Sequence, residues 1–208
     1  MPSFYFYKLT ADNNGAPCVD EDAKLLSLAI CKPMIRSTAQ PGDWIFGFAA
    51  NSLYRDNRLL YVACVTCKEK NGAYYTAPKY AQRGDCVYEK QGDHFVWREG
   101  ALHHGPSHLA HDLGNYPHYD KAHVLLGTDF RYFGKNGSAE YKSRFPLIKQ
   151  AVETLGVGHR VKHNKALREQ LQELKNWLWA DTRQADVGEP TSTRCHGVCH
   201  RTRFCGVV

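Results

Sequence analysis

The chain has 208 residues, which is within the range of one domain, and its hydrophobic fraction of 43% is ordinary for a globular protein. No apolar run approaches the roughly 20 residues that a membrane helix needs, and the N-terminus lacks the basic start and apolar stretch of a secretory signal. We therefore expect a cytoplasmic protein with no membrane partner. Its eight cysteines should be mostly reduced there, as core residues or metal ligands rather than disulfides.

The formal charge of +6 is unevenly distributed. Between Arg131 and Arg168 the chain carries nine Lys or Arg against two acidic residues, Glu140 and Glu153. Such a bias suits a polyanion, because each phosphate contact adds a salt-dependent increment of affinity, and it equally suits a solvated basic face. The residues for which we predict contacts with nucleic acid are Arg160, Lys162 and Lys165.

Strand patterns dominate the first two thirds of the chain. Aromatic and β-branched runs predict strands over residues 3–9, 43–49, 58–66 and 123–134, and residues 25–30 predict a strand or a short buried segment. Residues 86–99 predict a hairpin around Gln91-Gly92-Asp93, and residues 34–40 predict one helical turn that ends before Pro41 and Gly42.

Two helices are predicted near the C-terminus. Residues 146–156 open on a proline and end on a glycine, and Asn164 can cap a second helix with a leucine stripe at helical spacing. The stripe consists of Leu167, Leu171, Leu174 and Leu178. Together these elements favour an α+β domain over residues 1–180, with a curved, largely antiparallel sheet or a partly open small barrel and two C-terminal helices. Residues 181–208 predict a flexible tail that contains Cys and His.

Three motifs point to a family. "LAICKPMIR", "PGDWIFGF" and "DFRYFG" resemble the successive signatures of the second nucleotide-modification-associated domain family, found in phages and bacteria beside systems that hypermodify DNA bases. The resemblance runs from Ser3 to about Gly137. It implies a nucleotide or a nucleic acid with modified bases as the ligand and base-modification enzymes as possible partners, but it supplies no reaction and no cofactor. The "PGDW" turn before an aromatic strand also resembles the PUA, ASCH, EVE and YTH group of small barrels, which hold bases or nucleotides in a cleft.

The segment "CKPMIRSTAQPGDW", residues 31–44, predicts one wall of a nucleotide pocket. Lys32 precedes Pro33, which favours an extended backbone, and Arg36 follows within a helical turn. The two cations can clamp a phosphate, and Trp44, at the start of its strand, can stack on a base. In the alternative, Lys32 and Arg36 are surface charges, Asp43 caps the turn and pairs with Arg36, and Trp44 belongs to the core.

The segment "LHHGPSHLAHDL", residues 102–113, is the densest set of chemical groups in the chain. If it is helical, His108 and Asp112 have i, i+4 spacing, and a histidine oriented by a carboxylate can act as a general base or activate a nucleophile such as Ser107. His104 and His108, with Tyr132 of "DFRYFG", can instead read a base. His104, His108 and Asp112 can also bind a divalent metal, and single loop histidines are commonly inert.

The cysteine pairs carry weaker signals. Cys64 and Cys67 lie in an uninterrupted strand pattern, which points them to opposite faces and argues against a zinc knuckle. The C-terminal tail offers weak candidate metal ligands, which are Cys195, His196, Cys199, His200 and Cys205. We expect no metal and no cofactor, and a tail whose cysteines have no function.

The sequence leaves three functions open. The first choice is a module that binds nucleotides or modified bases. The second is an enzyme that acts on a modified base or nucleotide through the His/Asp/Ser cluster. The third is a structural partner in a base-modification complex. The arrangement of residues 101–120 distinguishes them, because side chains that converge around a cavity favour the first two functions and splayed side chains favour the third.

Overall fold

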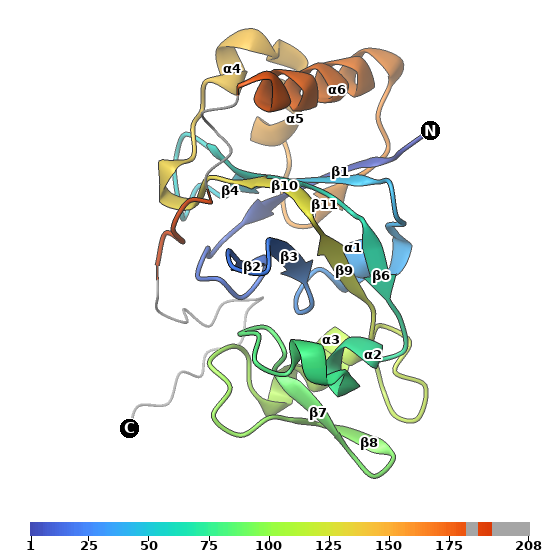
Figure 1. Ribbon diagram of the computed structural model, residues 1–208. Helices are drawn as coiled ribbons and strands as arrows, with labels where there is room; N and C mark the ends of the chain where they lie inside the picture. The colour runs from blue at the N-terminus through green and yellow to red at the C-terminus, as the bar shows by residue number, and fades with distance from the viewer. Residues whose placement is uncertain (182–186, 193–208) are drawn as a thin grey trace.

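A computed structural model describes residues 1–181 and 187–192, and its elements lie in layers (Figure 1). Three helices lie over one face of a five-stranded sheet, and a four-stranded sheet lies on the other side. Two short helices and a hairpin form the end furthest from the helical layer (Figure 1). This mixed α/β arrangement agrees with the predicted class of fold.

The five-stranded sheet is apolar on both faces. Its strands are, in spatial order, β10 (Asp129–Tyr132), β5 (Leu59–Cys64), β4 (Trp44–Ala49), β1 (Phe4–Leu9) and β11 (His159–Arg160). β1 runs parallel to β4, with Phe4 opposite Trp44, and the other neighbours are antiparallel. Successive side chains of a strand point to opposite faces, so Phe4 and Phe6 enter one core cluster whereas Tyr5 and Tyr7 enter another.

The face that carries Phe4 and Phe6 is covered by helices (Figure 1). They are α4 (Tyr141–Arg144), α5 (Pro146–Glu153) and α6 (Lys165–Ala180). α6 begins at Asn164, whose side chain accepts a 2.9 Å hydrogen bond from the Leu167 N–H, and its leucine stripe is buried. The helical layer thus consists of α4, α5 and α6 rather than the predicted two C-terminal helices.

The second sheet and the lower end of the molecule carry the remaining elements. The sheet consists of β2 (Cys18–Asp20), β3 (Leu25–Leu28), β9 (Val124–Gly127) and β6 (Cys67–Glu69). The other elements are α1 (Pro33–Thr38), α2 (Ala73–Thr76), α3 (Leu109–Leu113), β7 (Tyr88–Gln91), β8 (His94–Trp97) and the 3₁₀ turns Pro78–Tyr80, Pro106–His108 and Gly134–Asn136. Gln91 pairs with His94 across a two-residue turn, which confirms the predicted hairpin.

Two expectations about the sheets change. Within the described residues the two main sheets stay separate and no closed barrel forms, so the small-barrel alternative is not confirmed. The predicted strand over 58–66 ends at Cys64, and Cys67 begins β6 in the other sheet. The chain changes sheet here because Val65 donates its N–H to Asp43 whereas Thr66 donates its N–H to Leu126 of β9.

The predicted tail is in part attached to the body. The Gly188 N–H donates to the Tyr132 carbonyl at 2.7 Å, and the Thr191 N–H and hydroxyl donate to the Asp12 carboxylate at 3.1 and 2.9 Å. Contacts with the domain therefore continue beyond residue 181, where the tail was predicted to begin. No helix in the described part of the chain is long and apolar enough to cross a membrane.

Candidate functional site

A left-handed turn between β3 and α1 holds Cys31, which is 9% exposed. Cys31 has φ 57° and Lys32 has φ 44°, a region that residues with side chains rarely adopt and that is enriched at functional sites. The extended conformation predicted for Lys32 is therefore wrong. Arg36 stabilises the turn, because its backbone N–H donates to the Lys32 carbonyl at 3.1 Å and its Nε donates to the Cys31 carbonyl at 2.7 Å.

His104 connects Cys31 to a buried carboxylate. Its Nε2 lies 3.2 Å from the Cys31 Sγ, and its Nδ1 lies 2.5 Å from Asp112 Oδ2. His104 itself has φ 57°, in the loop between β8 and α3. The three side chains have the order of a nucleophile, a base and a group that orients the base, which is the arrangement of a catalytic triad.

Asp112 is fully buried in α3 and is surrounded by donors. The Tyr88 hydroxyl donates to Oδ2 at 2.8 Å, the Cys31 N–H donates to Oδ1 at 2.9 Å, and Arg36 lies 3.8 Å from Oδ1. Burial by itself would raise the pKa of Asp112, but the hydrogen bond from His104 and the charges of His104 and Arg36 hold that pKa below its ordinary value. An ionised carboxylate only accepts, so Nδ1 of His104 carries a proton.

The predicted pairing of His108 with Asp112 is replaced by the pairing of His104 with Asp112. His108 is the N-cap residue of α3, and the hydrogen bond to the Asp112 carboxylate comes from His104 instead. The His108 ring lies beside that of His104, with the centroids 4.5 Å apart and the planes tilted by 32°. Ser107 is exposed in the 3₁₀ turn. Within the described residues its hydroxyl forms no hydrogen bond with His104, His108 or Asp112.

The side chains predicted to clamp a nucleotide have mostly structural contacts. Arg36 is fully buried and its guanidinium donates to the carbonyls of Cys31, Asp112, Lys121 and His123, so it faces no solvent-borne phosphate. The residue lies beneath the site, where it joins the nucleophile turn to the helix of Asp112.

Asp43, Trp44 and Tyr132 also lie in the body of the protein. Asp43 closes the turn, since its Oδ1 accepts from the Ser3 N–H at 2.7 Å and its Oδ2 accepts from the Gln40 N–H at 2.9 Å. Trp44 is 8% exposed and belongs to the helix-facing core. Tyr132 is buried, and its hydroxyl donates to Asp12. Lys32, His104 and His108 are only half-buried, and their contact with a ligand stays a prediction.

The predicted nucleic acid face lies on the other side of the sheet edge. Arg160 lies in β11, where it pairs with Phe6 of β1, and it is half-buried. Lys162 and Lys165 are exposed. Because Phe6 faces the helical layer, Arg160 points away from the side on which Tyr7 lies. This face remains a prediction, separate from the triad.

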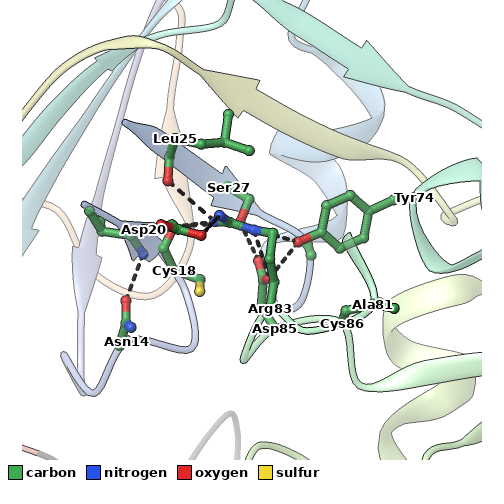
Figure 2. Close-up of polar contacts among 12 residues, drawn as sticks. Asn14, Cys18, Asp20, Leu25, Ser27, Tyr74, Ala81, Arg83, Asp85 and Cys86 are labelled. Atoms are coloured by element: carbon green, nitrogen blue, oxygen red, sulfur yellow. Dashed lines mark hydrogen bonds and ion pairs between the residues drawn. The ribbon is translucent and has the colours of Figure 1, made fainter. Parts of the chain in front are cut away.

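A buried ionic network connects β3, the strand before Cys31, to the segment of chain that contains His104 and Asp112 (Figure 2). Asp85 accepts from the Ser27 hydroxyl at 2.5 Å and from the Tyr74 hydroxyl at 2.6 Å, and Arg83 donates to Ser27 Oγ at 2.7 Å (Figure 2). Ser27 lies in β3, which leads directly to Cys31, whereas the segment that follows Tyr74 carries Tyr88, His104 and Asp112. The network therefore fixes the strand of the nucleophile relative to the segment that carries its base.

Other candidate sites lie elsewhere or receive no support. A cavity of about 290 Å³ lies between α6 and the strand β5, and it is lined mainly by Leu59, Phe133, Tyr141, Trp177 and Val187, none of which belongs to the triad. Among residues 1–181 and 187–192, no group of three or more His, Cys, Asp or Glu residues could hold a metal ion, which leaves the predicted metal alternative of His104, His108 and Asp112 without support. The weak metal candidates Cys195, Cys199, His200 and Cys205 lie outside the described residues.

The sequence reasoning missed Cys31. It ends an apolar run, "LAIC", so it resembles a core residue, and it lies 73 positions from His104. The only local signal was its place beside Lys32-Pro33, where a strand gives way to a helix.

Comparison with known proteins identifies one family. The family model for nucleotide modification associated domain 2 matches residues 1–197. This confirms the resemblance inferred from the motifs, and the match extends well beyond the predicted span of Ser3 to Gly137. No curated protein and no solved structure matches the chain significantly, so the more distant likeness to PUA-type barrels is not confirmed.

Proposed function

Because the chain belongs to the nucleotide modification associated domain 2 family, we propose that it is a cysteine-dependent enzyme that acts on a modified base or nucleotide. Cys31 is the nucleophile, His104 is the general base and acid, and Asp112 orients His104. The observation that carries the proposal is the pair of contacts made by one imidazole, 3.2 Å to Cys31 Sγ and 2.5 Å to Asp112 Oδ2. A module that only binds a nucleotide has no need of this arrangement.

The triad suits acyl transfer. The thiol proton of Cys31 passes to Nε2 of His104, and the sulfur attacks the carbonyl carbon of an amide or ester carried by the base or nucleotide. The tetrahedral intermediate expels an amine or alcohol, which takes the proton back from His104 and leaves a thioester on Cys31. Water or an amine acceptor then attacks the thioester, and the proton it loses returns through His104 to the released thiol.

The buried surroundings assist this chemistry. Nδ1 of His104 is held by an ionised carboxylate, which stabilises the imidazolium that forms when the thiol loses its proton. Asp112 is held in turn by Tyr88 and by the Cys31 N–H, so the ring cannot rotate freely. Geometry of this kind places reacting groups before the substrate arrives.

Thiol reactivity and turnover test the proposal together. The rate at which iodoacetamide alkylates Cys31 should exceed that of the exposed Cys67 near pH 7, and His104→Ala should lower it at least tenfold. His111→Ala, a change at an exposed histidine of α3, serves as the matched control. Intact mass spectrometry with DNA or nucleotides whose bases carry an amide or ester should show a transient adduct on Cys31 that Cys31→Ala abolishes. A Cys31 no more reactive than Cys67 and indifferent to His104→Ala, with no adduct, would leave binding without catalysis.

A further inference from the structure

The residue that follows the nucleophile is a cation that reaches toward the sheet edge. Lys32 is half-buried, and its Nζ lies 4.9 Å from the ring centroid of Tyr7. Tyr7 in β1 is paired with His159 in the edge strand β11, and residues paired in this way share a face. Lys32 and His159 therefore lie near each other on the same side of the sheet as Cys31.

Other observations support this proximity. Burial, and then the charge of Lys32, lowers the pKa of His159. The His159 ring also lies 6.1 Å from Tyr5, on the face that Tyr5 and Tyr7 share. At neutral pH an uncharged imidazole offers a donor and an acceptor beside the lysine.

The charge of Lys32 is not compensated by a carboxylate. No ion pair within the described residues involves Lys32. The nearby acids are engaged otherwise: Asp12 accepts from Tyr132 and Thr191, and Asp112 accepts from His104 and Tyr88. A cation withdrawn in part from water favours an anionic partner, since pairing offsets the lost hydration.

The backbone at Lys32 is unusual. Two consecutive residues with side chains occupy the left-handed region at Cys31 and Lys32, where glycine or asparagine would be less strained. Backbone of this kind persists only where the surrounding structure holds it, and it is found often at binding and active sites. The turn holds the thiol and the ammonium group in a fixed relation.

We propose that Lys32 and His159 form an anion subsite beside Cys31, which binds a phosphate group of the substrate. The proposal rests on the proposed function, because it takes Cys31 as the reacting atom. It assigns the substrate as a phosphate-bearing nucleotide or a nucleic acid strand rather than a free base or nucleoside. Lysine suits this role as a compact point charge with three donors.

Two alkylating reagents of similar size test the charge without knowledge of the substrate. Iodoacetate is anionic and iodoacetamide is neutral, and both replace iodide with the Cys31 sulfur. Lys32→Met should lower the ratio of the iodoacetate rate to the iodoacetamide rate by about five- to tenfold, as expected for a unit charge several ångströms from the reacting carbon. Lys149→Met, at an exposed residue of α5 on the far side of the sheet, removes the same charge and should leave the ratio unchanged (Figure 1).

A binding measurement identifies the ligand and does not require a reactive thiol. Titration of the protein with a deoxynucleoside 5′-monophosphate should shift the NMR signals of the His159 ring, and Lys32→Met should weaken the apparent affinity about tenfold. The matching deoxynucleoside should bind weakly in both proteins. A short oligodeoxynucleotide that binds more tightly than the monophosphate would identify a strand as the source of the phosphate, whereas the reverse order would identify a free nucleotide.

The outcomes separate the two proposals. An unchanged reagent ratio in Lys32→Met, or equal affinity for the nucleoside and its monophosphate, would overturn the anion subsite even if Cys31 is reactive. An unreactive Cys31 together with binding of the monophosphate that depends on Lys32 would refute catalysis and support the subsite.

Discussion

Replacing Asp112 with asparagine removes one charge from the triad with little change in shape. The carboxylate lies 2.5 Å from His104 Nδ1 and is fully buried, so its hydrogen bond is charge-assisted and shielded from water. An asparagine can still accept from the Cys31 N–H, but it offers His104 no negative charge. We expect the imidazolium form of His104 to lose most of its stabilisation.

The magnitude follows from the strength of that bond. A hydrogen bond to a charged group contributes about 1.5 to 3 kcal/mol, and 1.36 kcal/mol corresponds to about one pKa unit. The loss of this stabilisation of the imidazolium should lower the rate at which Cys31 is alkylated by about ten- to hundredfold near pH 7.

The assay is the rate of Cys31 alkylation by iodoacetamide between pH 5 and 9. Tyr88→Phe is the control, because it removes a neutral donor from the same oxygen and leaves the carboxylate charge, so its rate should change no more than about threefold. An Asp112→Asn protein that remains folded and keeps the wild-type rate and pH profile would refute the triad. An effect of Tyr88→Phe as large as that of Asp112→Asn would show that packing, not charge, accounts for the loss.

Four further results are expected. Asp112→Asn should destabilise the protein by about 3 kcal/mol, because it leaves Arg36 without its buried partner. The pKa of Asp112 in the folded protein is depressed, so this loss of stability, measured by urea denaturation, should be complete above about pH 4 and should shrink as the pH falls below that value. Trp44→Ala should lower the free energy of unfolding by about 3 to 5 kcal/mol, as for a core aromatic, and a loss below about 1 kcal/mol would return Trp44 to the rim. Removal of residues 187–208 should lower stability by about 2 kcal/mol through the lost donors to Asp12, and thermal unfolding of the truncated protein at an unchanged temperature would contradict this. If nucleic acid binds the basic face, replacing Arg160, Lys162 and Lys165 together should flatten the salt dependence of affinity by about one unit per lost phosphate contact without changing Cys31 alkylation.

Several features follow from the sequence because their signals are local. The leucine stripe of α6 and its Asn164 cap, the alternation of β1 and the hairpin at Gly92 depend on residues within a few positions of one another. The three motifs that indicate the family are also short and contiguous. The burial of Trp44 could not be predicted in the same way. The first residue of a strand is exposed or buried according to which element packs over it, and in this protein α6 packs over Trp44.

The site was decided by the tertiary structure alone. Cys31 and His104 are separated by 73 positions, and the sequence offered His108 as the closer match to a helical pair with Asp112. The contact forms where left-handed backbone occurs at both Cys31 and His104, with the Cys31 Sγ beside His104 and the His104 ring beside Asp112. Arg36 holds the Cys31 turn against the helix of Asp112. Neither the left-handed backbone nor the contacts of Arg36 can be predicted from a sequence pattern. The first depends on the path of the backbone, and the second depends on carbonyl groups that every residue possesses.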